Sequence, residues 1–257
     1  MEKVLVVGKN SFIAKSLPYD RVSYKNFDTV DLSQYHTVIN CALDPEYKSK
    51  SYSEVKDVDL EIGTKACHKS LRYIMFSTSK VYGNNIELRT YTEKSDVSPF
   101  DYHSDNKLRT EHKLISNFGD KVTIFRGSNI FGLEYGRNSF IGYMMTSLLD
   151  HGLIKMSIDL STKKDFLFVE DASRIIQLSC KQKLSGIYNL SSNYGLEAGK
   201  IAEYLTTSNG SVVAIDLKPD RAFILDNKKL QDDLEIKIGP FDFENIFKKL
   251  GSELCKI

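Results

Sequence analysis

The sequence predicts an α/β protein built on a doubly wound parallel sheet, with a smaller C-terminal lobe. Three observations carry this prediction. Short apolar runs alternate with amphipathic helical patterns over the first 130 residues, and a glycine directly follows the first apolar run. Groups of polar residues also come just after the predicted strands, where sheets of this kind bind their ligands.

The predicted elements follow one another regularly along the chain. Strands are expected over residues 4–7, 22–24, 37–41, 73–76 and 122–125. Helices are expected over 54–69 and 106–118, because apolar residues recur there every three or four positions: Val55, Val58, Ile62 and Ala66, then Leu108, Leu114, Ile115 and Phe118. After about residue 130, glycines and tyrosines become frequent and the alternation ends. We expect one domain over 1–257, with a core over about 1–130 and a smaller lobe over about 131–257.

The composition narrows the class of protein. The 257 residues are 41% hydrophobic and 27% charged, which suits a globular chain with a sizeable core. A net charge of +1 gives no basis for nucleic acid or a membrane surface as a partner. The chain starts without a signal-peptide pattern and has no apolar run long enough for a membrane span, so we expect a cytoplasmic protein. The four cysteines are too scattered for a metal or redox pair: Cys41, Cys67, Cys180 and Cys255.

The loop after the first strand stands where dinucleotide-binding proteins of the Rossmann type bind phosphate. In such loops one glycine makes the tight turn, a second admits the pyrophosphate, and a third lets the helix pack on the strand. Here Gly8 keeps the first position, whereas Ser11 and Ala14 occupy the other two. The Ser11 hydroxyl either donates to a phosphate, or the loop is an ordinary strand-to-helix turn. The residues expected at the phosphates are Gly8, Asn10, Ser11, Phe12 and Ile13.

The second strand carries the signal for cofactor choice. An acidic residue at its end would favour NAD, and none is present. Arg21 and Lys25 flank the strand instead. They favour NADP, or they are simply exposed charges.

Later segments resemble one family in order and spacing. The segments are residues 38–42, 76–83, 107–111, 126–132, 164–171 and 186–189. They resemble the extended short-chain dehydrogenase/reductases, the NAD-dependent epimerase/dehydratase family, whose members modify sugars linked to nucleoside diphosphates. The resemblance implies a dinucleotide-binding core over about 1–130 and a mostly substrate-binding lobe over about 131–257. It also implies that Asn40, Cys41 and Ala42 lie beside an NAD or NADP cofactor.

The resemblance implies a catalytic group in which one residue type is replaced. In this family a tyrosine phenol transfers the hydroxyl proton, a lysine four residues later lowers the phenol's pKa and contacts the nicotinamide ribose, and a serine or threonine polarises the same oxygen. Thr78 and Lys107 match two of these positions. The tyrosine position holds His103, and a tyrosine stands one place earlier, at Tyr102.

Three interpretations of this replacement remain open. His103 is the acid–base group, since a histidine has an ordinary pKa of about 6.5. Alternatively, Tyr102 acts in place of the missing phenol, which requires a helix that begins late or bulges, because five residues turn two side chains about 100° further apart than four. In the third interpretation catalysis has been lost.

Further positions bear on the substrate by resemblance. Ser79 and Lys80 stand where related dehydratases carry Asp and Glu, which disfavours 4,6-dehydration; Lys80 is alternatively an exposed loop residue. Asn129 resembles the asparagine that contacts the substrate diphosphate. Lys164 replaces the family's usual arginine, or is a solvated charge, and Arg221 is then a candidate for the missing guanidinium.

Two predictions concern assembly and activity. The helices over 54–69 and 106–118 form a four-helix dimer contact in similar proteins, so we expect a homodimer. We expect NAD(P)-dependent reduction or epimerisation of a nucleotide-diphosphate-linked sugar, in the synthesis of a surface polysaccharide sugar. The alternatives are a catalytically silent subunit that binds a nucleotide or a partner protein, and an isomerase that uses no redox step.

Overall fold

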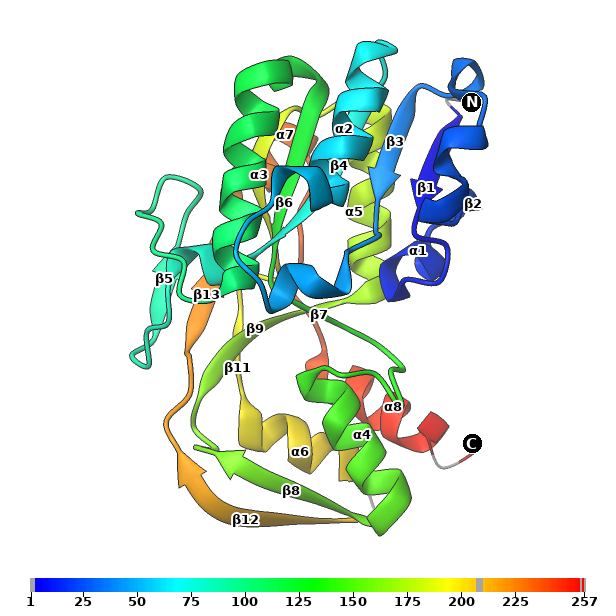
Figure 1. The fold of residues 1–257 in the computed structure, drawn as a ribbon. Helices are drawn as coiled ribbons and strands as arrows, with labels where there is room; N and C mark the ends of the chain where they lie inside the picture. Colours follow the sequence, from blue (N-terminus) through cyan, green and yellow to red (C-terminus); the bar gives the residue numbers. More distant parts are fainter. Residues whose placement is uncertain (1–2, 207–209, 255, 257) are drawn as a thin grey trace.

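A computed structural model of the chain describes residues 3–206, 210–254 and 256 (Figure 1). Its larger lobe is built on a six-stranded sheet in which every neighbouring pair is parallel. In spatial order the strands are β10 (Gly186–Leu190), β6 (Val122–Gly127), β4 (Arg72–Thr78), β3 (Thr37–Asn40), β1 (Val4–Val7) and β2 (Asp20–Val22). The predicted Rossmann-type doubly wound sheet is confirmed.

Helices cover both faces of this sheet, as alternation along β1 shows. Val4 and Val6 belong to one buried cluster and Leu5 and Val7 to another, because successive strand residues point to opposite faces. The first cluster includes residues of α1 (Phe12–Ser16), α5 (Val169–Gln182) and α7 (Lys228–Leu234). The second includes residues of α2 (Val58–His68) and α3 (Tyr102–Phe118). The sheet is therefore buried on both sides, which explains its near-continuous apolar strands.

The strand order reverses direction at β1. From β1 the chain passes to β2 on one side and then to β3 on the other. Parallel sheets bind ligands in the crevice outside the strand ends at such a point. Gly8 follows β1 here with a φ of +94°, and a Cβ on it would lie 2.6 Å from the Ala42 nitrogen. Only glycine fits this close approach of the two strand ends.

The smaller lobe lies below the sheet in Figure 1. One sheet runs β11 (Gly195–Glu197), β9 (Lys163–Phe168), β13 (Phe223–Leu225) and β5 (Arg89–Tyr91), and β7 (Asn129–Phe131) pairs with β9. A two-stranded sheet joins β8 (Leu153–Ile158) and β12 (Ser211–Lys218). The helices are α4 (Phe140–His151), α6 (Ala198–Thr206) and α8 (Phe243–Leu254). Their core includes Phe131, Met144, Phe166, Ile201 and Phe247.

Two helices begin elsewhere than predicted. The helix expected from residue 54 begins at Val58, because the Asp57 carboxylate caps it by accepting from the Leu60 amide at 3.0 Å. Val55, predicted on the buried face, precedes the helix and is 95% exposed, so that assignment is wrong. The helix expected from residue 106 begins at Tyr102, because Asp101 and Ser104 form a reciprocal capping box.

The segment between β1 and β3 is compact. Helix α1 has five residues, and β2 covers 20–22 instead of the predicted 22–24. A 3-10 helix (Tyr24–Thr29) follows and buries Phe27. Further 3-10 helices are Leu32–Gln34, Pro45–Lys48, Glu54–Lys56, Ser79–Tyr82 and Gly119–Lys121. Among the helices of the described residues, not one has both the length and the apolar character needed to span a membrane.

Candidate active site

The N-terminus of α3 brings the histidine and the lysine onto one face. Tyr102 is the first helical residue and is 53% exposed. His103 is second and half-buried, and Lys107, one turn later, is buried. The helix is regular from Tyr102 onward, with neither a late start nor a bulge. It therefore brings His103, and not Tyr102, to the face that carries Lys107.

Thr78 reaches the same edge from the end of β4. Its hydroxyl accepts from the Lys80 amide at 3.2 Å, which caps the 3-10 helix Ser79–Tyr82. The Lys80 ammonium then donates to the Asp101 carboxylate at 2.7 Å. Because Asp101 caps α3, this ion pair joins the end of β4 to the start of the helix with His103. Burial raises the pKa of Asp101, but hydrogen bonds from Lys80 and Ser104 outweigh it and lower the pKa to about 2.

The His103 imidazole sits in an environment that favours its neutral form. Burial lowers its pKa to about 4, with help from the charges of Lys107, Lys48 and Lys80; Asp101 acts in the opposite direction. This is well below the ordinary value of about 6.5. At neutral pH the side chain is an uncharged imidazole with one nitrogen free to accept a proton.

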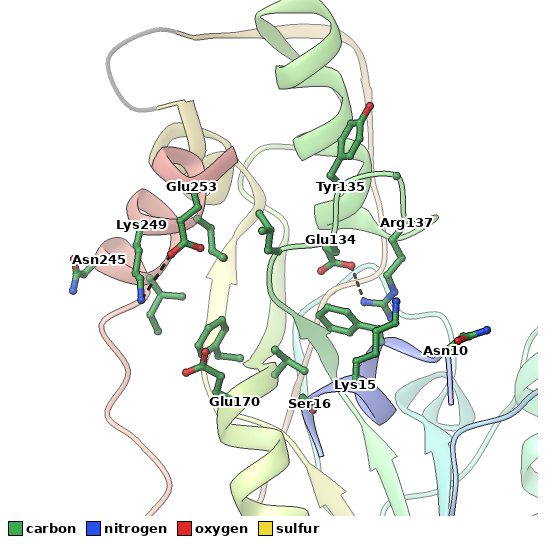
Figure 2. A pocket seen from close by; sticks show the side chains of 17 residues that line it. Asn10, Lys15, Ser16, Glu134, Tyr135, Arg137, Glu170, Asn245, Lys249 and Glu253 are labelled. Carbon is green, nitrogen blue, oxygen red and sulfur yellow. Dashed lines mark hydrogen bonds and ion pairs between the residues drawn. The ribbon is translucent and has the colours of Figure 1, made fainter. Parts of the chain in front are cut away.

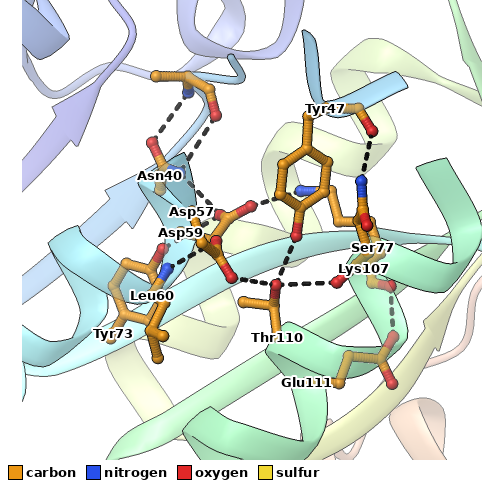
Figure 3. A network of polar contacts seen from close by, with 12 residues as sticks. Asn40, Tyr47, Asp57, Asp59, Leu60, Tyr73, Ser77, Lys107, Thr110 and Glu111 are labelled. Carbon is orange, nitrogen blue, oxygen red and sulfur yellow. Dashed lines mark hydrogen bonds and ion pairs between the residues drawn. The ribbon is translucent and has the colours of Figure 1, made fainter. Parts of the chain in front are cut away.

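Lys107 is held by a buried carboxylate on the neighbouring helix (Figure 3). Its ammonium lies 2.5 Å from the Asp59 carboxylate, and both side chains are almost fully buried. Asp59 also accepts from the Asn40 amide at 2.7 Å and from the Tyr73 hydroxyl at 3.2 Å. Asn40 in turn exchanges hydrogen bonds with the backbone of Ala42. The lysine is thus connected to the end of β3, at the point where the strand order reverses.

A second carboxylate organises the loop beside this pair. Asp57 accepts from the Thr110 hydroxyl at 2.5 Å, and that hydroxyl shares a hydrogen bond of 2.5 Å with the Tyr47 hydroxyl. The Tyr47 ring lies 5.6 Å from the Lys107 ammonium. Asn106 donates to two carbonyls of the same loop, those of Tyr47 and Lys50. The loop after β3 is therefore fixed against α3.

A buried ion pair between two motif residues fixes the middle of α3. Arg126 contacts Glu111 through several donors, the shortest at 2.7 Å, and both side chains are buried. Ser77 also donates to Glu111. Arg126 further donates to the Tyr82 hydroxyl at 3.2 Å, and that hydroxyl donates to Asn189 at 2.8 Å. Five residues of the recognised motifs thus hold the strands and α3 together.

The predicted phosphate loop has fewer side-chain hydrogen bonds than the start of α3. Gly8 makes the tight turn, Asn10 is exposed, and Ile13 packs against the core. The first-turn amides of α1, including those of Phe12 and Ile13, have no intrahelical acceptor. Ser11 is the N-cap residue but makes no capping bond with its side chain. Its hydroxyl is bonded to the Cys41 thiol instead, whose pKa burial and Asp59 raise to about 12.

A cleft of about 1040 Å³ adjoins the outer side of this loop (Figure 2). Asn10, Phe12 and Lys15 line one wall, and residues of loop 133–137, α5 and α8 line the others. Arg137 stacks on the Phe12 ring at 4.3 Å and pairs with Glu134 at 2.7 Å. Thr78, His103 and Lys107 do not line this cleft. It therefore borders the predicted phosphate loop without including the predicted acid–base residues.

The two basic residues near β2 are on the surface. Arg21 lies in β2 and Lys25 in the following 3-10 helix, and both are exposed. They remain accessible to an additional phosphate on a bound nucleotide.

Arg221 and Ser79 contact each other. The buried Arg221 guanidinium donates to the carbonyls of Gly83 and Ser79, each at 2.6 Å, and to the Ser79 hydroxyl at 3.2 Å. It also stacks on the Phe223 ring at 4.1 Å. Burial lowers its pKa to about 10. The guanidinium therefore fixes the loop after β4, and the donors named here are already occupied.

Lys164 and Asn129 are similarly engaged. Lys164 is buried and not solvated; it donates to the Arg221 carbonyl and pairs with Asp220, each at 2.8 Å. Burial lowers its pKa. The Asn129 amide donates to the Asp165 carbonyl at 2.9 Å. Of the five residues predicted at the substrate, Lys80 has a partly exposed side chain, at 43%, which is paired with Asp101.

Sequence reasoning missed Asp59, Tyr47 and Lys48. Asp57 and Asp59 lie in the first two turns of the helix predicted over 54–69, where acidic residues are ordinary because they favour the helix dipole. Only Asp57 caps the helix, whereas Asp59 faces inward. The available signal for an inward-facing carboxylate was a charged residue beside the apolar positions Val58 and Ile62.

The described residues contain no group of three or more His, Cys, Asp and Glu side chains that could hold a metal ion. Among the described residues, Cys41, Cys67 and Cys180 are not joined in disulfides, and Cys255 lies outside the described residues.

The fold has many counterparts among solved structures. The UDP-N-acetylglucosamine 4-epimerase from Methanobrevibacter ruminantium M1, in complex with UDP-N-acetylmuramic acid, is similar at a TM-score of 0.80 and 16% identity, over 99% of this chain and 98% of that chain. The dTDP-glucose 4,6-dehydratase from Bacillus anthracis str. Ames, in complex with NAD, is similar at 0.79 and 17%, over 100% and 97%. RMD from Pseudomonas aeruginosa, complexed with NADPH, is similar at 0.79 and 15%, over 100% of both chains. These likenesses show the fold.

A comparison of sequence identifies the family. No curated protein matches the chain. The family profile described as "NAD dependent epimerase/dehydratase family" matches residues 25–191, which is more than half of the chain. That span includes the end of β3, Thr78, the whole of α3 and the ion pair of Glu111 with Arg126. The chain therefore belongs to the NAD-dependent epimerase/dehydratase family.

Proposed function

We propose that this protein reduces or epimerises a sugar linked to a nucleoside diphosphate, using NAD or NADP. One observation carries the proposal: His103 and Lys107 share a face of α3 at the sheet edge where Thr78 and Asn40 end their strands. The solved counterparts include enzymes whose names specify nucleotide sugars, and complexes with NAD or NADPH. Members of a family that share this edge are expected to share the substrate class.

The residues at the strand ends fit a dinucleotide. Gly8 makes the tight turn beside Ala42 that a Cβ would block, and the amides of Phe12 and Ile13 supply donors suited to a pyrophosphate. Asn10, Ser11, Asn40, Cys41 and Ala42 complete the expected contact set, with Lys107 at the nicotinamide ribose. When bound, the cofactor supplies a hydride acceptor or donor. Lys25 and Arg21 are exposed at the β2 side, and they favour NADP over NAD.

His103 is the proposed acid–base residue. Its imidazole is neutral at physiological pH, so it accepts a proton from a sugar hydroxyl when that carbon is oxidised. It is a weak base in the free protein because burial and three lysines disfavour its cation. A bound diphosphate brings negative charge and raises the pKa of the imidazole toward the working range. Thr78 is the proposed group that polarises the same oxygen.

Lys80 is the proposed contact for the substrate diphosphate. Its ammonium pairs with Asp101 on a partly exposed side chain, whereas Lys164 and Arg221 are buried and engaged with backbone carbonyls. Asn129 and Ser79 complete the proposed substrate side. The absence of acidic side chains at positions 79 and 80 argues against 4,6-dehydration, because elimination of water needs an acid and a base there. We place the reaction in the synthesis of a surface polysaccharide sugar in the cytoplasm.

We further propose a homodimer formed through α2 and α3. Both helices lie on the same face of the sheet. Light scattering at micromolar concentration is expected to give twice the chain mass, and a monomer mass would contradict this assignment.

A second function has one observation in its favour. Lys107 is already paired with a buried carboxylate, and His103 is a weak base, as expected of a silent subunit that keeps only the fold. Titration with NADPH and NADH, followed by nicotinamide fluorescence, separates the two functions; the chain has no tryptophan to add background. Saturable binding, tighter for NADPH, is expected for the enzyme. No binding of either at millimolar concentration would leave the silent subunit as the better account.

A further inference from the structure

We propose that Asp59 is a positioning residue that fixes the Lys107 ammonium and offsets its charge at position 103. The proposal rests on the proposed function only in taking His103 as the acid–base group. It adds a residue that no sequence motif indicated, and its test does not require turnover.

The geometry fixes the carboxylate from three elements. One Asp59 oxygen lies 2.5 Å from the Lys107 ammonium on α3. The other accepts from Asn40 at the end of β3 and from Tyr73 within β4, at 2.7 and 3.2 Å (Figure 3). The exposed fractions of the Asp59 and Lys107 side chains are 2% and 7%. A buried carboxylate with both oxygens occupied cannot follow a moving lysine, so it determines where the ammonium lies.

The residue at position 103 makes this counter-charge necessary. A lysine beside a tyrosine favours the charged phenolate, which helps proton transfer near neutral pH. The same lysine beside a histidine disfavours the charged imidazolium, which hinders it. When an imidazole replaces the phenol, the same positive charge therefore destabilises the ionised form of the acid–base group instead of stabilising it. Asp59 supplies a negative charge that reduces this destabilisation.

The other charged groups nearby do not neutralise the Lys107 ammonium. Lys48, on the 3-10 helix after β3, and Lys80, after β4, also lower the pKa of His103, and Asp101 raises it. Asp101 is paired with Lys80. Asp57 accepts from Thr110, Tyr52 and the Leu60 amide, none of them a cation. Asp59 is left as the anion in direct contact with Lys107.

The test is an NMR titration of the histidine imidazoles in the full chain. The chain has five histidines, and the spectrum of His103→Gln assigns the signal of interest. Lys107→Met is expected to raise the pKa of His103 by about one pH unit, from a Coulomb interaction across a partly buried site. Asp59→Asn is expected to lower it by a similar amount, about one pH unit, because the freed ammonium is no longer offset and can approach the imidazole. In the Lys107→Met background, Asp59→Asn is expected to change the pKa of His103 by less than about half of its effect in the native background.

Controls separate positioning from general loosening of the helices. Tyr73→Phe removes one donor to Asp59 without changing any charge, so the His103 titration is expected to stay in place. An unchanged or raised pKa in Asp59→Asn overturns the proposal, as does an equal fall in both backgrounds. If Asp59→Asn does not fold alone, thermal unfolding decides: the double variant with Lys107→Met is expected to fold, and its failure to do so would also overturn the proposal. A chain without turnover leaves these outcomes unaffected.

Discussion

The two ends of the candidate active-site edge differ in how many contacts stabilise them. At the phosphate end, α1 has five residues, its N-cap side chain makes no capping bond, and β2 has three residues. At the acid–base end, α3 has 17 residues, a reciprocal capping box and two buried ion pairs. The proposed cofactor site thus depends on a few backbone groups, whereas the position of His103 depends on an extensive set of buried charges. Substitutions at the two ends should therefore fail in different ways.

The largest effect is expected where the acid–base end is locked. Glu111→Ala leaves the Arg126 guanidinium buried without its carboxylate, which should cost about 3–5 kcal/mol in the free energy of unfolding. Lys113→Ala on the same helix breaks an exposed pair with Glu54 and should cost less than about 0.5 kcal/mol. Urea unfolding of the two variants measures the difference. Equal losses would mean that the buried pair does not hold α3.

The next effect concerns the turn at the phosphate end. Gly8→Ala places a methyl group 2.6 Å from the Ala42 nitrogen at a φ of +94°, so we expect a loss of about 2–4 kcal/mol and of cofactor binding. Gly119→Ala is the matched control, because no atom lies within 4 Å of its Cβ position. Chemical unfolding and the fluorescence titration report on both variants. Retention of cofactor binding by Gly8→Ala would remove the turn from the cofactor site.

An intermediate effect should appear as pH dependence at the acid–base end. The pKa of His103 is lowered in the folded chain from 6.5 to about 4, so the unfolded chain binds the proton more tightly. Its contribution to stability is therefore present above pH 6.5 and is lost as the pH falls toward 4. Between those values the native chain should lose about 2 kcal/mol more than His103→Gln, allowing for partial exposure. Parallel pH profiles of unfolding for the two proteins would contradict the burial of this imidazole.

The smallest effect is expected from the exposed cations near β2. Replacement of both Arg21 and Lys25 by alanine should leave stability within about 0.5 kcal/mol, because exposed charges contribute little. The same change should weaken NADPH binding by about tenfold or less and leave NADH binding unchanged. Fluorescence titrations with NADPH and NADH measure the two affinities. A variant that loses affinity for both equally would show that these residues do not select between them.

The sequence predicted strands β1, β3, β4 and β6 of the central sheet close to their observed positions, because these strands are largely buried and read as apolar runs. The short strands β5, β7, β11 and β13 escaped prediction, since three-residue strands are stabilised by pairing with distant segments. The start of α3 was placed four residues late because apolar periodicity begins only at Leu108. There the capping pair of Asp101 and Ser104 decides the boundary.

The candidate site was predicted less completely. Thr78, His103 and Lys107 followed from family resemblance, and the fold places all three at one edge. The role of Arg221 could not be read from its position in the chain, because its carbonyl acceptors, at Ser79 and Gly83, are about 140 residues away in sequence. Asp59 escaped because an acid near a helix start has an ordinary explanation in capping and the helix dipole. Such roles depend on which groups meet across elements, which spacing along one chain does not reveal.

The most direct test of the acid–base assignment is hydride transfer by the native chain and by His103→Gln, followed through nicotinamide absorbance with keto-sugar nucleotides. The account predicts turnover by the native chain, and a fall of about 100-fold or more in His103→Gln with cofactor affinity nearly unchanged. Equal turnover by the two proteins would contradict the assignment of His103. Absence of turnover in the native chain with every sugar nucleotide, both by absorbance and by analysis of the sugar products, would contradict the enzymatic function itself.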